Sequence, residues 1–290
     1  MNSRIRTASA LALGSILLLG LPLARGQSAF TQWTFDSLAV GTNLSPAPST
    51  GTGTTSSLGM GLFTGPDTSN IDGVVGTDNG SYDGLPNNTG TANNMWRIVG
   101  SNGWNNGAAI GTQGAQFLTS TVGQQGITAQ FDLYITAQGE SSFQAQYTSD
   151  GTTWINAPLT YAGSLIAGNG AGSVTTNSSN PNIVNGTYFQ AGVSGAKNDA
   201  QFDDFTVNLT GISAVNNDPN FGLRIVNAAT GSAVTNLSLG TALNNTSGNW
   251  RIDNVTFEGQ VIPEPSTWAL IAGCAVLGWA VIRRSPALQA

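Results

Sequence analysis

Residues able to do chemistry are few in this chain. Its 290 residues include no histidine and one cysteine, Cys274. These absences exclude Ser-His-Asp and Cys-His catalysis. They also exclude zinc, copper, haem and iron–sulfur sites held by His or Cys, and disulfides within the chain. Carboxylates, amides, hydroxyls and aromatic rings are what remains.

Paired carboxylates are a catalytic device that needs neither histidine nor cysteine. Glycoside hydrolysis uses two carboxyl groups about 5–9.5 Å apart. No spacing or local motif singles out a pair among the available carboxylates, and the sequence therefore favours a non-enzymatic protein, with a glycoside hydrolase as the less favoured alternative. The carboxylates considered are Asp203, Asp204, Asp253, Glu140 and Glu258.

Oxygen ligands for a hard cation are also present. Asp36 follows the predicted strand that contains Trp33, and Asp253 and Asn254 lie on the last predicted strand. Terminal strands of a sandwich often pair, and calcium binds carboxylate and amide oxygens. The sequence thus raises the hypothesis of a structural Ca²⁺ at Asp36, Asp253 and Asn254. The simpler interpretation is that these are strand-end and bulge residues in water, and no other cofactor is indicated.

Two tryptophans are candidates for sugar binding. Trp104 lies in Gly103-Trp104-Asn105-Asn106, and Trp154 follows a predicted turn. Sugar rings stack on exposed indoles, and Asn, Gln and Asp hydrogen-bond their hydroxyls. The sequence therefore raises polysaccharide as a possible partner. The alternative is ordinary packing, which is the role of most tryptophans in a sandwich.

The charge balance excludes other partners. Between positions 27 and 262 the basic residues are Arg97, Lys197, Arg224 and Arg251, and acidic residues outnumber them more than threefold. Such a surface argues against nucleic acid, whose affinity comes mostly from Lys and Arg at phosphates. It also argues against anionic lipid surfaces.

Alternation with a period of two dominates the middle of the chain. Ile127, Phe131 and Ile135 share one strand face while Gln130 and Asp132 share the other. We predict strands over 32–35, 95–99, 115–120, 127–135, 143–147, 153–155, 187–193 and 221–225. Gly/Ser/Thr/Asn-rich stretches 42–60, 64–93 and 163–182 are predicted loops. No amphipathic helix interrupts this pattern, which indicates an all-β fold, an antiparallel β-sandwich or jelly roll.

Two segments echo each other. In both 202–207 and 252–257 the apolar phase slips by one residue, at Asp203-Asp204 and at Asp253-Asn254. A β-bulge at each pair would return both halves of the strand to the core face. We therefore predict two bulges, each re-aiming an acidic side chain.

The two ends of the chain carry targeting signals. Arg4 and Arg6 precede an apolar run over 8–23, and small residues up to Gly26 offer a cleavage site. This pattern predicts a signal peptide over 1–26, handled by the secretory translocon and signal peptidase. At the other end, the run over 268–282 is apolar, with Trp268 and Trp279 toward its two ends, and together with Ser266 and Thr267 it predicts one transmembrane helix over 266–282.

The C-terminal features resemble a known family. Pro263-Glu264-Pro265, the apolar run and the basic pair Arg283-Arg284 together are similar to the PEP-CTERM sorting domain of Gram-negative bacteria that make exopolysaccharide. The resemblance covers only about the last thirty residues. It implies recognition by exosortase, a membrane-embedded cysteine protease-like enzyme, and removal of the signal near the tripeptide. It implies nothing about what the rest of the chain binds.

Together these features predict three parts: the signal peptide, a sandwich passenger over 27–260, and a sorting signal over 261–290 with a basic tail. The run from Phe35 to Gly41 looks like the first strand and turn of carbohydrate-binding-type jelly rolls. We expect a non-enzymatic protein, exported as a single-pass membrane precursor and delivered to the cell surface or an exopolysaccharide matrix. A carbohydrate-binding module is the alternative.

Overall fold

The computed structural model describes residues 26–36, 45–59, 95–98, 104–162, 165–167, 172–176, 178–192, 200–237, 240–243, 248–263 and 265–284. The predicted signal peptide up to Arg25, the predicted loop over 64–93 and Glu264 of the tripeptide lie outside these ranges. One compact unit extends from Gln27 to Gln260, and the segment from Val261 onward belongs to a separate unit.

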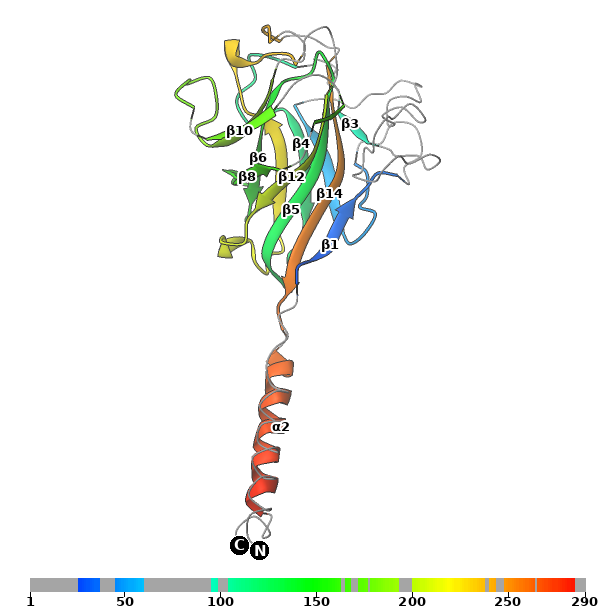
Figure 1. Cartoon of the computed structure of the whole chain (residues 1–290), viewed down its shortest axis with the longest axis vertical. Coiled ribbons are helices and arrows are strands. Elements are labelled where there is room, and N and C mark those ends of the chain that lie inside the picture. The colour runs from blue at the N-terminus through cyan, green and yellow to red at the C-terminus, as the bar shows by residue number, and fades with distance from the viewer. Residues whose placement is uncertain are drawn as a thin grey trace, which may run out of the picture. The chain divides into compact units, whose positions relative to one another are not determined.

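The compact unit is built from two antiparallel sheets. Sheet A has the order β1 (Ser28–Trp33), β14 (Trp250–Val261), β5 (Gln124–Ile135), β12 (Ala200–Asn208) and β8 (Leu159–Tyr161), with β3 (Trp96–Ile98) paired to β14 and β9 (Leu165–Ala167) paired to β12. Figure 1 shows β1, β14, β5 and β12 side by side. Each neighbouring pair with a described register is antiparallel.

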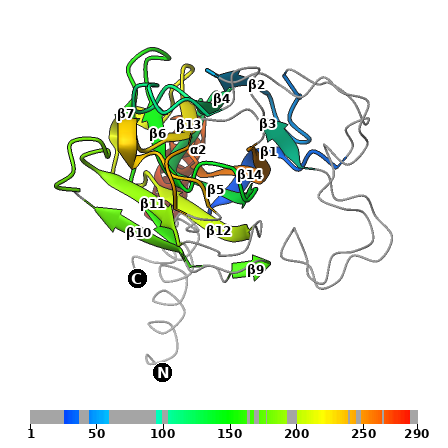
Figure 2. The same cartoon turned by 90° about the horizontal axis from the view of Figure 1, so that it is seen from above.

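Sheet B packs against sheet A. Its order is β10 (Gly172–Thr176), β11 (Thr187–Ala191), β6 (Ser142–Thr148), β13 (Gly222–Asn227), β4 (Gly114–Thr119) and β2 (Gly53–Leu58), with β7 (Ile155–Asn156) paired to β6. Figure 2 shows β6, β13 and β4 in one layer and β5, β14 and β1 in the other. The predicted β-sandwich is therefore confirmed.

The core fills the space between the sheets. The alternation predicted on β5 is confirmed, because Ile127, Phe131 and Ile135 are buried on its inner face. Aromatic rings join the layers: the centroid of Phe205 on sheet A lies 4.9 Å from that of Phe143 on sheet B, in an edge-on arrangement. Buried aromatic rings provide large apolar area and favour such tilted contacts, so they hold the two sheets together.

Two of the predicted loops contain strands. β2 lies within 42–60, and β9 and β10 lie within 163–182. β2 and β10 end the strand order of sheet B and obtain their backbone hydrogen bonds from β4 and β11. Edge strands tolerate polar side chains on both faces. A segment such as Gly-Thr-Thr-Ser-Ser-Leu therefore shows no alternation although it is a strand. The predicted strands over 143–147 and 153–155 and the turn between them form a hairpin, in which β7 pairs with β6 at Gln146 and Tyr147.

Helical structure is sparse in the described ranges. Short 3₁₀ turns, η2 (Ser213–Val215) and η3 (Gly231–Ala233), lie in connections of the sandwich. The helix α2 (Pro265–Arg284) begins at a proline, a residue suited to the first helical position. Leu270, Val276 and Trp279 are exposed on α2. In the portion of the chain that the structure describes, no helix combines the length and the apolar character required to cross a membrane.

Candidate functional site

The first predicted bulge is confirmed on β12. The pairing of β12 with β5 shifts between Phe202 and Phe205, and two residues, Asp203 and Asp204, lie opposite the single residue Asp132. Asp204 has a φ of 62°, in the left-handed region that Asp tolerates better than most residues. Its backbone N–H donates to Asp132 Oδ1 at 2.9 Å. The bulge therefore directs a backbone donor onto a carboxylate of the neighbouring strand.

The second predicted phase change occurs on β14. Ile252 and Val255 are both buried although three positions separate them, and Asn254 has a φ of 51°. Asn254 Nδ2 donates to Asp132 Oδ2 at 2.8 Å, while its backbone N–H donates to Asp253 Oδ1 at 2.8 Å. Both irregularities thus meet at Asp132, which sequence analysis had placed on a strand face without a role.

This arrangement bears on the calcium hypothesis. Asp253 is fully buried and Asp36 is exposed after β1. Asn254 uses its amide nitrogen as a donor to Asp132 and, at 3.4 Å, to Asp253 Oδ2. The same carboxylates therefore serve as hydrogen-bond acceptors within the fold. No group of three or more His, Cys, Asp or Glu side chains able to hold a metal occurs among the described residues. The calcium site stays a prediction.

The candidate catalytic carboxylates differ in burial. Glu140 is fully buried, Asp203 is 3 % exposed, and Asp204 is exposed. Glu258 is half-buried on β14, where its Oε2 accepts from Thr128 Oγ1 at 3.5 Å. Neither of the two cavities described below has a carboxylate in its lining. The structure brings Asp203 near Asp204 and Asp253 near Asn254, but it does not direct a pair of these groups into either cavity.

Glu140 has an unusual environment. Burial raises the pKa of its carboxyl well above the ordinary value, and hydrogen bonds from Ser142 and from the backbone N–H of Ala229 offset this only in part. Ser142 Oγ donates to Glu140 Oε1 at 3.2 Å, and Oε2 has no hydrogen-bond partner within the described ranges. The Glu140 carbonyl accepts from Trp250 Nε1 at 2.8 Å. Glu140 thus lies among core groups.

The proposed exposure of Trp104 is wrong. Its side chain has no exposed surface, and its ring centroid lies 4.4 Å from that of Trp250. The flanking Gly and Asn residues do mark an irregular segment, in which Asn105 N donates to Gln113 Oε1 at 3.1 Å. That segment turns its one large apolar side chain inward, because burying an indole removes its apolar area from water. A buried ring offers no face to a sugar.

Trp154 has a different environment. It is half-buried beside sheet B, and the Cζ atom of Arg224 lies 3.8 Å from its ring centroid. Arg224 Nε also donates to Gln116 Oε1 at 2.8 Å. A Cβ atom at Gly222 would lie 2.9 Å from Trp154 Cη2 and 2.6 Å from Leu118 Cδ2. The missing side chain at Gly222 therefore makes room for the indole against the sheet.

Arg224 belongs to a row of polar side chains that crosses sheet B. Neighbours in the row are opposite one another in strand register, and all are half-buried: Ser56 on β2, Gln116 on β4, Arg224 on β13, Gln146 on β6 and Asn156 on β7. Phe117 and Leu223, the residues next to two of them, are core residues. Because side chains alternate along a strand, the row faces outward. We call it the polar row.

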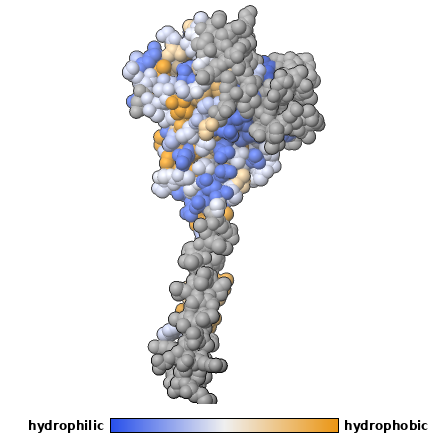
Figure 3. All heavy atoms as spheres, in the orientation of Figure 1, coloured by the Kyte–Doolittle hydropathy of each residue, from blue (hydrophilic) through white to orange (hydrophobic). Residues whose placement is uncertain are grey.

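The two sheets differ in charge. The strands of sheet B contain no Asp or Glu, and Arg224 is their one charged residue. The strands of sheet A contain all the carboxylates of the bulge region together with Glu258. The side of the molecule on which β5 and β14 lie is mostly hydrophilic in Figure 3, with small hydrophobic patches.

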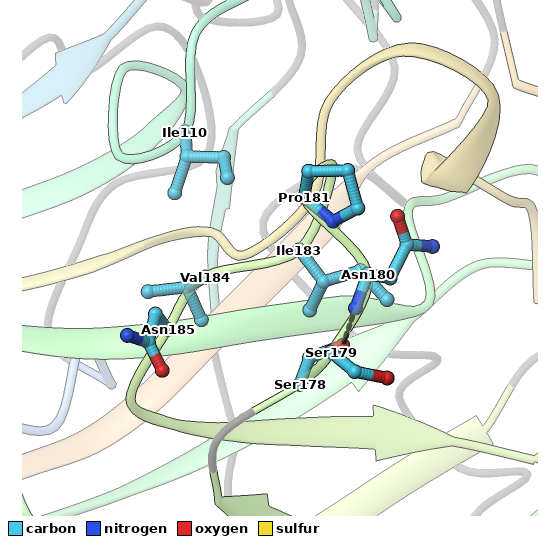
Figure 4. A pocket seen from close by; sticks show the side chains of 8 residues that line it. All are labelled: Ile110, Ser178, Ser179, Asn180, Pro181, Ile183, Val184 and Asn185. Atoms are coloured by element: carbon cyan, nitrogen blue, oxygen red, sulfur yellow. Dashed lines mark hydrogen bonds between the residues drawn. The ribbon is translucent and has the colours of Figure 1, made fainter.

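A cavity of about 440 Å³ adjoins one end of the polar row. It is lined by Ile110 and residues of 178–185, with Pro181, Ile183 and Val184 as apolar walls and serine and asparagine side chains beside them (Figure 4). Gly111, next to Ile110, has a φ of 82°, and a Cβ there would lie 2.8 Å from Gln146 Nε2. This close approach places the cavity beside Gln146 of the polar row.

A second cavity, of about 270 Å³, adjoins the other side. Its lining includes Thr54, Leu118, Asn220 and Phe221. Leu118 also flanks Gly222 together with Trp154. The outer face of sheet B thus carries an indole, a guanidinium and amide and hydroxyl groups, with a hollow near each end. Trp154 was predicted from the sequence, but the polar row was not, because its members are distant in sequence.

Comparison with known proteins gives no match: no family model matches the chain, and no curated protein and no solved structure shows detectable similarity to it.

Proposed function

We propose that this chain is a non-enzymatic protein of the cell surface or extracellular matrix, exported by a Gram-negative-type bacterium and sorted through a PEP-CTERM-type signal. The supporting observation is the place of the tripeptide. The compact sandwich unit ends at Gln260, Pro263 is exposed outside any strand or helix, and Pro265 is the first residue of α2. A processing enzyme needs such an accessible, extended segment, because a backbone paired in a sheet cannot enter its active site.

The route follows from the two ends. The signal peptide over 1–26 directs the chain to the translocon. The predicted transmembrane segment over 266–282 holds the precursor in the membrane as a single-pass helix with Arg283 and Arg284 on the cytoplasmic side, although α2, within the described residues, does not by itself combine the length and apolar character of an ordinary membrane span. An exosortase-like enzyme then removes the C-terminal segment. The exposed apolar side chains on α2, such as Leu270 and Leu277, support an apolar environment for this helix.

Replacing Pro263, Glu264 and Pro265 with alanine tests this proposal. The unprocessed form should remain in the membrane fraction, because the recognition element is lost while the apolar helix is kept. Immunoblots of fractionated cells measure the ratio of precursor to released form. Ser266→Ala with Thr267→Ala is the matched control and should be processed normally. Release of the tripeptide variant at the wild-type rate would contradict the proposed signal.

We further propose that the sandwich is a jelly roll that binds carbohydrate. The order β1-β14-β5-β12 facing β11-β6-β13-β4 supports the first part, since two Greek keys generate this arrangement of eight strands, which lectin domains also use. Fold alone does not give function. The specific observation for carbohydrate is the outer face of sheet B, where Trp154 lies beside the amides of the polar row.

Trp154→Ala tests carbohydrate binding. We expect about a tenfold loss of retention on the glycan that the wild type binds, as loss of one stacked aromatic ring costs roughly 1–3 kcal/mol in comparable stacking sites. Tyr134→Ala is the control, since that ring lies under Arg251 on the other sheet. Retention is measured by affinity electrophoresis in gels that contain the polysaccharide. Equal retention of the wild type and Trp154→Ala would remove this face as the binding site.

A further inference from the structure

Among the described residues, Arg224 has no anionic partner. It is the one charged residue in the strands of sheet B, and within the described residues no carboxylate pairs with it. Burial lowers the pKa of its guanidinium from the ordinary value, although an arginine stays protonated at neutral pH. A partly desolvated charge with no counter-ion has lost hydration without gaining a partner. Such a group gains more from an arriving anion than a fully hydrated one.

The guanidinium is also held in place. Gln116 Oε1 accepts from Nε at 2.8 Å, and the Trp154 ring lies 3.8 Å from Cζ. These contacts use the Nε donor and one face of the plane. The two Nη groups donate to no acceptor in the described part of the protein. A fixed guanidinium with both Nη groups unused has the fork geometry that binds a carboxylate through two parallel hydrogen bonds.

We propose that the outer face of sheet B binds an acidic polysaccharide of the uronic-acid type, with Arg224 binding the sugar carboxylate and the rest of the polar row hydrogen-bonding hydroxyls. The proposal rests on the carbohydrate-binding function proposed above. The row crosses five neighbouring strands about 4.8 Å apart, and the two cavities lie near its ends. This is enough length for several successive sugar units of one extended chain.

The net negative charge of the protein does not prevent an acidic polysaccharide from binding to the outer face of sheet B. The net charge of the chain is −6, but interactions between exposed charges are largely screened beyond about 8 Å at physiological salt. Two carboxylates in turns beside sheet B have internal partners: Asp150 Oδ1 accepts from the N–H groups of Thr152 and Thr153, and Asp218 Oδ1 accepts from Asn220 N at 2.8 Å. The strands below the row add no negative charge.

The test compares two forms of one polysaccharide. Polygalacturonate and its fully methyl-esterified form have the same backbone and differ in the carboxylate charge. The purified full-length chain in mild detergent is titrated with oligomers of each form by calorimetry. We expect the wild type to bind the charged form about tenfold more tightly, the usual effect of a charge-assisted bidentate pair. Arg224→Gln should reduce that preference to about one while binding of the ester is kept.

Two further variants make the result specific. Arg251→Gln removes a guanidinium that also lies over an aromatic ring, Tyr134, but on sheet A, and it should keep the tenfold preference. Arg224→Lys keeps the charge without the fork and should keep only part of the preference. If the wild type binds both forms equally, the carboxylate site is overturned while carbohydrate binding stands. If the wild type binds neither form, the carboxylate site and carbohydrate binding by this face are both overturned. The sorting proposal is tested separately, by the processing of the same chain.

Discussion

Sheets A and B use polar residues in opposite ways. On sheet A, Asp132 accepts hydrogen bonds from Asp204 N and Asn254 Nδ2, and the bulges that supply these donors lie on either side of β5. On sheet B, Arg224 has an amide and an indole as partners and unused Nη donors. Both carboxylate oxygens of Asp132 accept hydrogen bonds, whereas the Nη groups of Arg224 donate to no acceptor among the described residues.

This difference separates structural from binding roles. A buried carboxylate without donors is costly, so Asp132 and the two bulges stabilise one arrangement of three strands. A half-buried guanidinium on an outer face contributes little to the fold by itself. The metal and catalytic roles predicted for the acidic residues stay predictions, while the structure shows Asp132 as a hydrogen-bond acceptor within the fold. It assigned no role to Arg224.

Trp104→Ala is expected to have the largest effect on stability. The indole is fully buried against Trp250, and truncating such a ring costs about 3–5 kcal/mol in the free energy of unfolding. Urea denaturation monitored by circular dichroism measures it. Trp154→Ala is the matched control and should cost about 1 kcal/mol, because its ring is only half-buried. If the two variants were equally stable, the buried position of Trp104 would be wrong.

Asp132→Ala should have the next largest effect. It removes the acceptor of the Asp204 backbone N–H and the nearer of the two acceptors of the Asn254 side-chain amide, which we expect to cost about 2–4 kcal/mol. Gln116→Ala on sheet B removes the acceptor of Arg224 Nε, which belongs to a half-buried side chain. This change should lower the free energy of unfolding by less than about 1 kcal/mol. The same denaturation measurement compares them. A smaller loss for Asp132→Ala than for Gln116→Ala would reverse the proposed difference between the sheets.

Glu140→Gln should change the pH dependence of stability. Because the folded-state pKa of Glu140 is raised, the folded state holds its proton more tightly than the unfolded state does. The stabilising contribution is therefore complete below the unfolded pKa, about 4.3, and is lost as pH rises toward the folded value. One such proton gives a slope of about 1.4 kcal/mol per pH unit. Denaturation between pH 4 and pH 8 should show a shallower decline for the Gln variant.

Asp150→Asn provides a control of opposite sign. Hydrogen bonds from Thr153, and from Thr152 and Thr148, lower the pKa of the Asp150 carboxyl in the β6–β7 turn. Its contribution is present above the unfolded pKa, about 3.9, and is lost as pH falls below it. The Asn variant should therefore differ from wild type in how stability falls below pH 4. Parallel curves for wild type and Glu140→Gln over pH 4–8 would contradict the assignment to Glu140.

Local patterns predicted much of the fold. The alternation on β5 and the phase slip at Asp203-Asp204 follow from which face of the sheet each side chain must occupy. Each of these patterns can be recognised from the sequence of a single strand. Edge strands such as β2 were missed, since a polar strand with one neighbour needs no alternation. Trp104 was a candidate for sugar binding because its flanking residues resemble those of an exposed loop, and its burial agrees with the alternative of ordinary packing.

The polar row could not be predicted from the sequence pattern of any single strand. Ser56, Gln116 and Arg224 lie on strands that are far apart in sequence, and only the register of β2, β4 and β13 brings them together. Alternation indicates that each residue faces outward, but it does not indicate which residues are neighbours. Trp154 was identified from its residue type, whereas the guanidinium over its ring depends on strand pairing.

The most direct test of the central claim is where the ligand binds on the protein. In two-dimensional NMR spectra of the ¹⁵N-labelled full-length chain, oligogalacturonate is added in steps and side-chain signals are followed. We predict shifts at the Trp154 indole N–H, the Arg224 Nε–H and the Gln116 and Gln146 amides, with the Asn254 amide unchanged. Shifts confined to Asn254 and its neighbours on sheet A would contradict the account.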